Sequence, residues 1–177
     1  DIFEDAKRRD FKCNAIYYDI LRDKIVDPLG GVADIQNKIL DTVRAPEEVF
    51  KSDGLRLMRL ARFSGELNFK PTEKVIDGAK AYAINICDIS GERIYAELNR
   101  MLISDQKYRY SDPYGHYNSI KLLHEIGVLK YVFPELVLGA GMPQRKDFHR
   151  YDVLEHSFRA LLYSKEKVRL SALIHDI

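Results

Sequence analysis

Two charged side chains three residues apart, Asp53 and Arg56, offer the most specific chemistry in this sequence. On a helix, residues with this spacing lie side by side, so a carboxylate acceptor stands next to a guanidinium donor. Cytosine and adenine each present an amino donor beside a ring-nitrogen acceptor, whereas uracil and guanine present the reverse order. A site with such a pair can reject mispaired bases, because unpaired buried polar groups are costly. The simpler alternative is a capped helix, with Ser52 as N-cap and Arg56 as the ion-pair partner of Asp53.

Arginines continue along the same predicted helix, because Arg56, Arg59 and Arg62 recur at every third residue and form a ridge. Guanidinium groups hold phosphates through bidentate, charge-assisted hydrogen bonds, so this ridge can bind a triphosphate. Spaced charges more often form a solvated face. Here, however, no acidic residue lies between Arg56 and Glu66 to offset the mutual repulsion, which favours an anionic ligand.

A second polar group lies near the start of the chain, in the segment 8–15. If this segment is helical, Asp10 and Asn14 lie one turn apart on one face. Arg9 can then reach a phosphate, Asp10 can accept a hydrogen bond from a ribose hydroxyl, and Asn14 can bridge to the sugar or base. The alternative is an ordinary amphipathic helix, although a basic cluster at a helix N-terminus opposes the helix dipole.

Three motifs in this order resemble those of the class II tRNA nucleotidyltransferase and poly(A) polymerase family. They are Arg-Arg-Asp-Phe-Lys-Cys-Asn-Ala at 8–15, Asp-Pro-Leu-Gly-Gly at 27–31 with Asp34-Ile35, and Ser-Asp-Gly-Leu-Arg-Leu-Met-Arg at 52–59. Two positions depart from the family pattern, since Lys12 replaces a usual Thr and Ser52 a usual Glu. We assign no catalytic role to the segment 27–34, which reads as a turn and, in the family, as a flexible element.

The resemblance implies that Asp53 and Arg56 select the base and that the helix at 90–98 supports them. The residues predicted to bind nucleotide are Arg9, Asp10, Asn14, Asp53, Arg56, Arg59 and Arg62. The implied parent protein is a nucleotidyltransferase that adds C and A to tRNA 3′ ends from CTP and ATP. Its Mg²⁺ ions are expected on carboxylates upstream of this chain. The expected partners are therefore tRNA or another RNA 3′ end, ATP and CTP, and we expect the 177 residues alone to be inactive.

Three alternatives stay open at this point. A poly(A) polymerase of the same family can use the same base-reading pair. A metal-dependent phosphohydrolase is a second possibility, because the end of the chain resembles an HD-type domain. A non-catalytic RNA-binding or nucleotide-binding fragment is the third.

The HD-type resemblance depends on His156 and on the pair His175-Asp176. These three residues are candidate metal ligands, with His149 and His124 as further histidines in this part of the chain. A complete HD site needs a further downstream Asp. We therefore expect an HD-type helical fold and no working metal centre.

The overall composition limits the class of protein in which these motifs occur. The chain has 177 residues with a net charge of +1, so its positive charge is local, at Lys7–Arg9, along the arginine ridge and at Arg145-Lys146. Its two cysteines form no metal or disulfide framework, which favours a cytoplasmic setting. No apolar run approaches the roughly 20 residues of a membrane helix, so no membrane partner is expected. The first residue, Asp1, and the abrupt end at Ile177 suggest an internal piece of a longer protein.

The expected fold is mostly α: a remnant of an α/β nucleotidyltransferase head, then a helical neck and body, then the start of an HD-type helical domain. The expected boundaries are 1–46 for the head, 47–104 for the neck that selects nucleotide, 105–145 for the body and 146–177 for the HD-type start. Strands are predicted within 16–26 and at 39–43. Helices are predicted over 2–18, 53–63, 72–84, 91–102, 119–126, 152–163 and 167–174.

Overall fold

The computed structural model describes residues 1–109, 111–142 and 151–177. Within these ranges the chain is mostly helical, as expected, and its short strands lie in the first half. The α-helices are α1 (Ile2–Arg8), α2 (Gly31–Asn37), α3 (Pro46–Ser52), α4 (Leu55–Leu67), α5 (Glu73–Ala81), α6 (Gly91–Leu102), α7 (Gly115–Glu125), α8 (Leu129–Val132), α9 (Pro134–Leu138), α10 (Val153–Tyr163) and α11 (Arg169–Ile174). Short 3₁₀ turns cover η1 (Lys12–Asn14), η2 (Ala83–Asp88), η3 (Ser104–Gln106) and η4 (Glu166–Val168).

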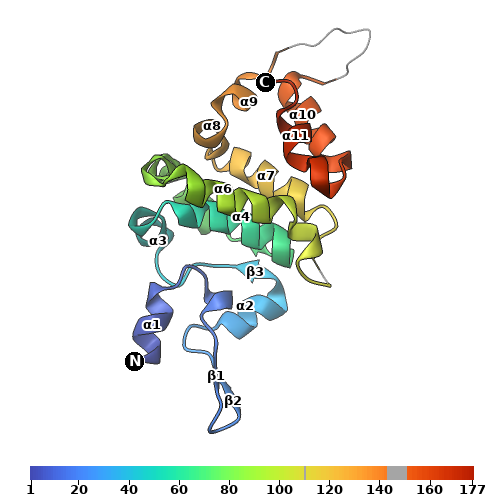
Figure 1. Cartoon of the computed structure of the whole chain (residues 1–177). Coiled ribbons are helices and arrows are strands. Elements are labelled where there is room, and N and C mark those ends of the chain that lie inside the picture. Colours follow the sequence, from blue (N-terminus) through green and yellow to red (C-terminus); the bar gives the residue numbers. More distant parts are fainter. Residues whose placement is uncertain (110, 143–150) are drawn as a thin grey trace.

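The elements follow one another along an elongated molecule (Figure 1). Helix α1 and the hairpin of β1 (Tyr17–Asp19) and β2 (Lys24–Val26) lie at the end that holds the N-terminus. Helices α4, α6 and α7 form the middle, and α8 to α11 lie at the opposite end with the C-terminus. In the described part of the chain, no helix has the length and apolar character needed to cross a bilayer.

The described strands form two small sheets. Strands β1 and β2 pair antiparallel, with Tyr17 opposite Val26, which confirms the predicted hairpin. The second pair was not predicted: β3 (Ile39–Leu40) runs parallel to β4 (Lys70–Pro71). A parallel pair needs a crossover connection, and here that connection contains α3 and α4. The strands therefore attach the first part of the chain to the central helices.

Helix α4 is the centre of the core. Its side chains Leu57, Met58, Leu60 and Ala61 are fully buried, in the spacing expected of a helix covered on more than one side. Helices α6 and α7 both pack against it. It ends at Asn68, whose left-handed backbone (φ 56°) closes the last turn. The site residues at its start are thus carried by a helix that is packed into the core.

Helices α4 and α7 approach each other through glycines. A β-carbon added at Gly65 would lie 2.1 Å from the Ser119 hydroxyl and 2.5 Å from the backbone oxygen of Gly115. A β-carbon at Gly115 would meet the Gly65 backbone oxygen at 2.6 Å. The Ser111 hydroxyl adds a 2.8 Å hydrogen bond to the backbone oxygen of Glu66. The two backbones can therefore touch only because neither position carries a side chain.

The predicted helix over 2–18 was wrong beyond Arg8. Arg9 and Phe11 are extended, and the Lys12 N–H donates to the backbone oxygen of Asp41 at 3.0 Å. The Val43 N–H donates in turn to the backbone oxygen of Asp10. Backbone pairing with a segment some thirty residues away therefore overrides the local helical pattern. Helices α2, α3, α8 and α9 were also not predicted. Helices α2, α3 and α9 begin at Gly31, Pro46 and Pro134, which read as turns, and α8 has only four residues.

The C-terminal helices match their predictions closely and are joined to the middle by a buried ion pair. The Arg169 guanidinium donates to both carboxylate oxygens of Asp105 at 2.6 and 2.8 Å and to the backbone oxygen of Leu102. The expected domain boundaries stay predictions, and the one at 145/146 lies outside the described residues, as do His149 and the Arg145-Lys146 cluster.

Candidate functional site

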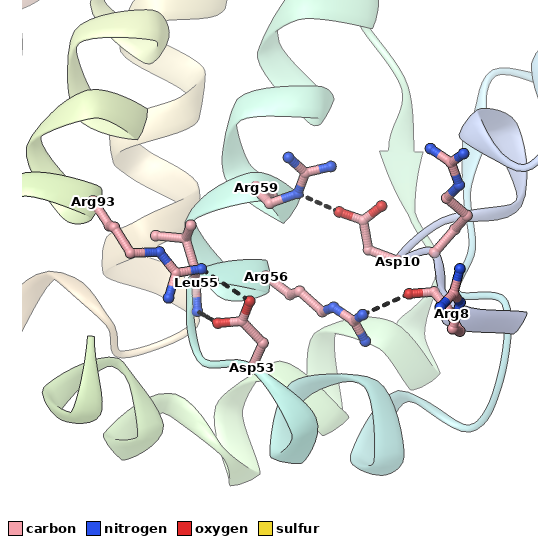
Figure 2. Close-up of a pocket in the computed structure, with 8 residues that line it drawn as sticks. Arg8, Asp10, Asp53, Leu55, Arg56, Arg59 and Arg93 are labelled. Atoms are coloured by element: carbon pink, nitrogen blue, oxygen red, sulfur yellow. Dashed lines mark hydrogen bonds and ion pairs between the residues drawn. The ribbon is translucent and has the colours of Figure 1, made fainter. Parts of the chain in front are cut away.

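A pocket of about 240 Å³ opens where α1 ends and where α4 and α6 begin. Figure 2 shows the side chains that surround it. They are Arg8, Arg9, Asp10, Asp53, Leu55, Arg56, Arg59 and Arg93. Five arginines face two carboxylates, so the lining carries a net positive charge although the whole chain is nearly neutral. Such a pocket suits an anionic ligand.

Asp53 occupies the bend between α3 and α4 and keeps acceptor capacity. One carboxylate oxygen accepts the Leu55 N–H at 3.0 Å, at the start of α4, whose N-cap is Gly54. The other accepts from Arg93 on α6 at 3.2 Å. A carboxylate has about four lone-pair sites, so two of these bonds leave room for a ligand donor.

Arg56 is held by three oxygens from α3 and the end of α1 rather than by Asp53. Its guanidinium donates to the Ser52 hydroxyl at 2.8 Å, to the Val49 backbone oxygen at 3.4 Å and to the Arg8 backbone oxygen at 2.7 Å. The simpler alternative, an ion pair between Asp53 and Arg56, is therefore not formed, and Asp53 pairs with Arg93 instead. Ser52 also is not the N-cap of α4, because its hydroxyl donates back to Val49.

Asp10 is the buried carboxylate of the pocket, at 3% exposure. It accepts from the Arg59 guanidinium at 2.5 Å and from the Asn14 amide at 2.6 Å. Burial raises the pKa of Asp10, but the hydrogen bond and charge of Arg59, aided by Asn14, lower this pKa on balance below its usual value. Asn14 itself does not line the pocket, so in this structure it positions Asp10.

Arg8 and Arg9 share one exposed acidic partner on α1. Both guanidinium groups contact Asp5, at 2.8 Å for Arg8 and 3.1 Å for Arg9. Hydrogen bonds from Arg8, Tyr17 and Arg9 lower the pKa of Asp5, and the Asp5 hydrogen bond raises the pKa of Arg9. Because these pairs are solvent-exposed, they are weak, and an anion in the pocket can compete for both arginines.

Arg62 does not fit its predicted place in the site. Its side chain is 8% exposed and donates to Glu66 at 2.7 Å and to Glu97 at 2.6 Å. Burial lowers the pKa of Arg62, but the hydrogen bond and charge of Glu66, together with Glu97, raise it on balance. Arg62 therefore joins α4 to α6 in the core. The ridge argument failed here because successive third positions drift around a helix, and α6 covers the third arginine.

Arg93 and Leu55 line the pocket although the sequence interpretation did not select them. The helix at 90–98 was expected to give structural support only. A signal was present: Arg93 lies in the first turn of α6, off its buried stripe, where a cation opposes the helix dipole. A cation in that unfavourable position indicates a partner, which here is Asp53.

Two family models match the chain. Residues 1–41 match the poly A polymerase head domain. Residues 68–138 match a domain described as the probable RNA and SrmB-binding site of polymerase A.

Curated relatives extend the likeness over nearly the whole chain. A multifunctional CCA protein of Xanthomonas campestris pv. campestris is 30% identical over an alignment of 186 residues, which covers 98% of this chain and 42% of the relative. One from Acinetobacter baumannii is 32% identical with the same coverage. The chain belongs to the CCA-adding enzyme and poly(A) polymerase family. It spans about 42% of the length of these relatives.

Solved structures of this family share the fold. The Bacillus stearothermophilus CCA-adding enzyme in complex with CTP has a TM-score of 0.72 at 28% identity, over 99% of this chain and 39% of that one. A tRNA nucleotidyltransferase complexed with a primer tRNA and an incoming ATP analog, at 23% identity and a TM-score of 0.67, supports the fold alone. It covers 99% of this chain and 45% of that one.

The three candidate metal ligands of the HD-type segment lie together at the far end of the molecule from the pocket. The ligand atoms of His156, His175 and Asp176 are all within 4.8 Å of one another. The two histidine Nε2 atoms are 3.2 Å apart, close to the roughly 3.3 Å between two nitrogens bound to one tetrahedral ion. The Nδ1 atom of His175 lies 2.8 Å from the Ala172 backbone oxygen, so it donates there and leaves Nε2 as an acceptor.

The pocket does not suit the Mg²⁺ that the family resemblance implies. Its two carboxylates, Asp10 and Asp53, are each bound by an arginine, and five arginines surround them. Mg²⁺ prefers carboxylate and water oxygens without competing cations. The residues of this pocket therefore fit an anionic ligand rather than the metal ion.

Proposed function

We propose that this chain is the nucleotide-selecting and RNA-binding part of a tRNA nucleotidyltransferase that adds C and A to tRNA 3′ ends from CTP and ATP. The observation that carries the proposal is the arginine-rich pocket with Asp53 and Arg56 on its wall. Its supporting context is the family membership and the likeness to a CCA-adding enzyme solved with CTP.

Base selection is assigned to Asp53 and Arg56. Asp53 has free acceptor capacity for the exocyclic amino group of cytosine or adenine. Arg56 donates three hydrogen bonds to protein oxygens, and a guanidinium has five N–H groups, so two remain for a ring nitrogen. Both groups are already fixed by protein contacts, so binding requires little ordering of side chains.

The phosphates are assigned to the arginines on the other walls. Arg8 and Arg9 come from the end of α1 and Arg59 from the second turn of α4. Arg59 also pairs with Asp10, which keeps its guanidinium in place at the cost of part of its charge. The role of the chain is then positioning and electrostatic stabilisation of the phosphates, while the Mg²⁺ ligands are expected outside these 177 residues.

The proposal is tested by nucleotide binding to this chain. Isothermal titration with CTP, ATP, UTP and GTP should give at least about tenfold tighter binding of CTP and ATP, because the other bases leave Asp53 and Arg56 mispaired. Asp53→Ala should remove most of this preference, whereas Asp77→Ala, an exposed control on α5, should keep it. Equal affinity for all four nucleotides in the unaltered chain would refute base selection at this pocket.

A poly(A) polymerase of the same family remains the nearest alternative, since the same pair of residues accepts adenine. The titration separates the two activities only if CTP fails to bind. Addition of C or A to tRNA by these 177 residues alone would contradict the expected position of the metal ligands.

One observation favours a second candidate function at the far end of the molecule. The gathering of His156, His175 and Asp176 offers three ligands for a transition-metal ion, with one histidine already oriented by a backbone oxygen. This arrangement supplies part of a metal-dependent phosphohydrolase site of the HD type, which needs a further Asp. Zn²⁺ titration, described with the predictions below, tests whether the ligands bind an ion.

A further inference from the structure

A second pocket, away from the arginines, is lined largely by tyrosines. It has a volume of about 190 Å³ and lies between the start of α7 and the end of α10. Its lining residues are Tyr114, Tyr117, Asn118, Leu162 and Tyr163. Tyr114 is 57% exposed and Tyr163 is 78% exposed. Exposed tyrosines from two helices that gather around one opening are unusual for a surface with only a structural role.

The chemistry of this pocket matches a nucleobase. Aromatic rings stack on the flat faces of bases, and this stacking tolerates any base because every base has a π face. The Asn118 amide nitrogen already donates to Asp112 at 2.6 Å, so its carbonyl oxygen remains to accept from a base amino group. The lining carries no charged side chain, so it attracts the base rather than its phosphate.

Cations for a connecting phosphate lie beside the pocket. Lys121 is one helical turn after Tyr117. Its ammonium group is 5.9 Å from that ring and 3.2 Å from the Glu155 carboxylate, with which a phosphate would compete. Lys165 and Lys167 follow Tyr163 closely and are exposed. An aromatic platform with flanking cations is the arrangement by which proteins bind single-stranded nucleic acid.

We infer that this tyrosine pocket holds one unpaired base of an RNA strand bound to the protein. The inference rests on the proposed RNA-binding function, and three of the five lining residues fall within the segment that matches the RNA-binding family model. The tyrosine pocket is separate from the arginine pocket. Arg56 lies in the first turn of α4, whereas α7 begins against Gly65, about 14 Å further along that helix. One nucleotide cannot fill both pockets.

The chain contains no tryptophan, so Tyr163→Trp introduces a single indole at the pocket, whose fluorescence can be excited apart from that of the tyrosines. Addition of an eight-nucleotide oligoadenylate RNA should quench this fluorescence, because a stacked base lies against the indole. CTP at a concentration that saturates the arginine pocket should leave the fluorescence unchanged. Tyr163→Ala should weaken binding of the fluorescein-labelled octamer, measured by anisotropy, by about tenfold. Tyr163→Phe should bind normally, because the ring is retained.

Tyr95→Ala is the matched control, since Tyr95 is 55% exposed on α6 and does not line the pocket. Circular dichroism should show all variants folded. If the octamer binds but leaves the tryptophan unquenched, or if Tyr163→Ala binds like Tyr95→Ala, the pocket assignment is wrong. AMP that quenches as strongly as the octamer at equal base concentration would make this a mononucleotide site and overturn the RNA assignment. If CTP binds and the octamer does not, the inference fails while nucleotide selection stands.

Discussion

Replacing each of three arginines of α4 by methionine should separate effects on ligand binding from effects on stability. Arg56, Arg59 and Arg62 are spaced identically in sequence, yet their surroundings differ. The side chain of Arg62 is 8% exposed, and its two carboxylate partners, Glu66 and Glu97, are 2% and 5% exposed. Arg62→Met therefore leaves Glu66 without its cation and leaves Glu97 with only the more exposed Arg100, at 3.3 Å.

The cost of this change follows from the burial of the partners. Removal of one member of a buried ion pair destabilises a protein by about 3–5 kcal/mol. For a chain of this size, about 2–4 °C of melting temperature corresponds to each kcal/mol. Arg62→Met should therefore lower the melting temperature by about 6–20 °C. Arg56→Met loses only hydrogen bonds to a hydroxyl and backbone oxygens, so its cost should be near 1 kcal/mol.

The assay is thermal unfolding followed by circular dichroism, combined with CTP titration at 10 °C, where the variants remain folded. Arg62→Met should bind CTP like the unaltered chain once folded, whereas Arg56→Met should lose CTP binding at a stability cost of only about 1 kcal/mol. Arg59→Met should show both effects in part, because Asp10 keeps its bond from Asn14. A melting temperature of Arg62→Met within about 2 °C of the unaltered chain would refute the burial argument. Loss of CTP binding by the folded Arg62→Met variant would show that Arg62 belongs to the binding site.

Three further predictions concern single residues. Arg93→Ala should change the stability by less than about 1 kcal/mol, because the pair of Arg93 with Asp53 is exposed. The same variant should weaken the preference for CTP over UTP. An unchanged preference in titrations would exclude a positioning role of Arg93. The lowered pKa of Asp10 means that its ionised form adds stability above its unfolded pKa of about 4, and that this stability is lost as the pH falls below that value. Asp10→Asn should therefore flatten the dependence of unfolding free energy on pH between about 5 and 2, and an unaltered slope in urea titrations would contradict this. Zn²⁺ should bind the chain in calorimetry and His175→Ala should abolish that binding; equal binding by both would place the ion elsewhere.

Local patterns in the sequence were sufficient for most of the helices and for the hairpin. Helix α6 was predicted with the observed bounds, because its apolar stripe and its start at Gly91 are both local signals. The parallel pair of β3 and β4 could not be predicted, since its partners are some thirty residues apart and each strand has only two residues. The end of α1 was missed for the same reason, because Lys12 pairs with the distant Asp41 backbone.

The site was only partly predictable, and its errors have one cause. The sequence supplied the residue types and the order of the motifs, which brought Arg9, Asp10, Asp53, Arg56 and Arg59 to one pocket. Whether the face of α4 that carries an arginine is open or buried depends on where α6 packs. Arg62 was therefore assigned to the ligand when α6 buries it, and Arg93 on α6 was left out when α6 brings it to Asp53.

The contact between Gly65 and Gly115 fixes more than a packing distance. Because the two backbones touch, α4 and α7 cannot rotate or slide against each other without a clash. The interval between the arginine pocket and the tyrosine pocket is then set by the length of a helix and does not depend on a hinge. An RNA strand whose end lies at the first pocket would present the same nucleotide, counted from that end, at the second. A side chain introduced at either glycine should push the two helices apart, so that this interval is no longer fixed.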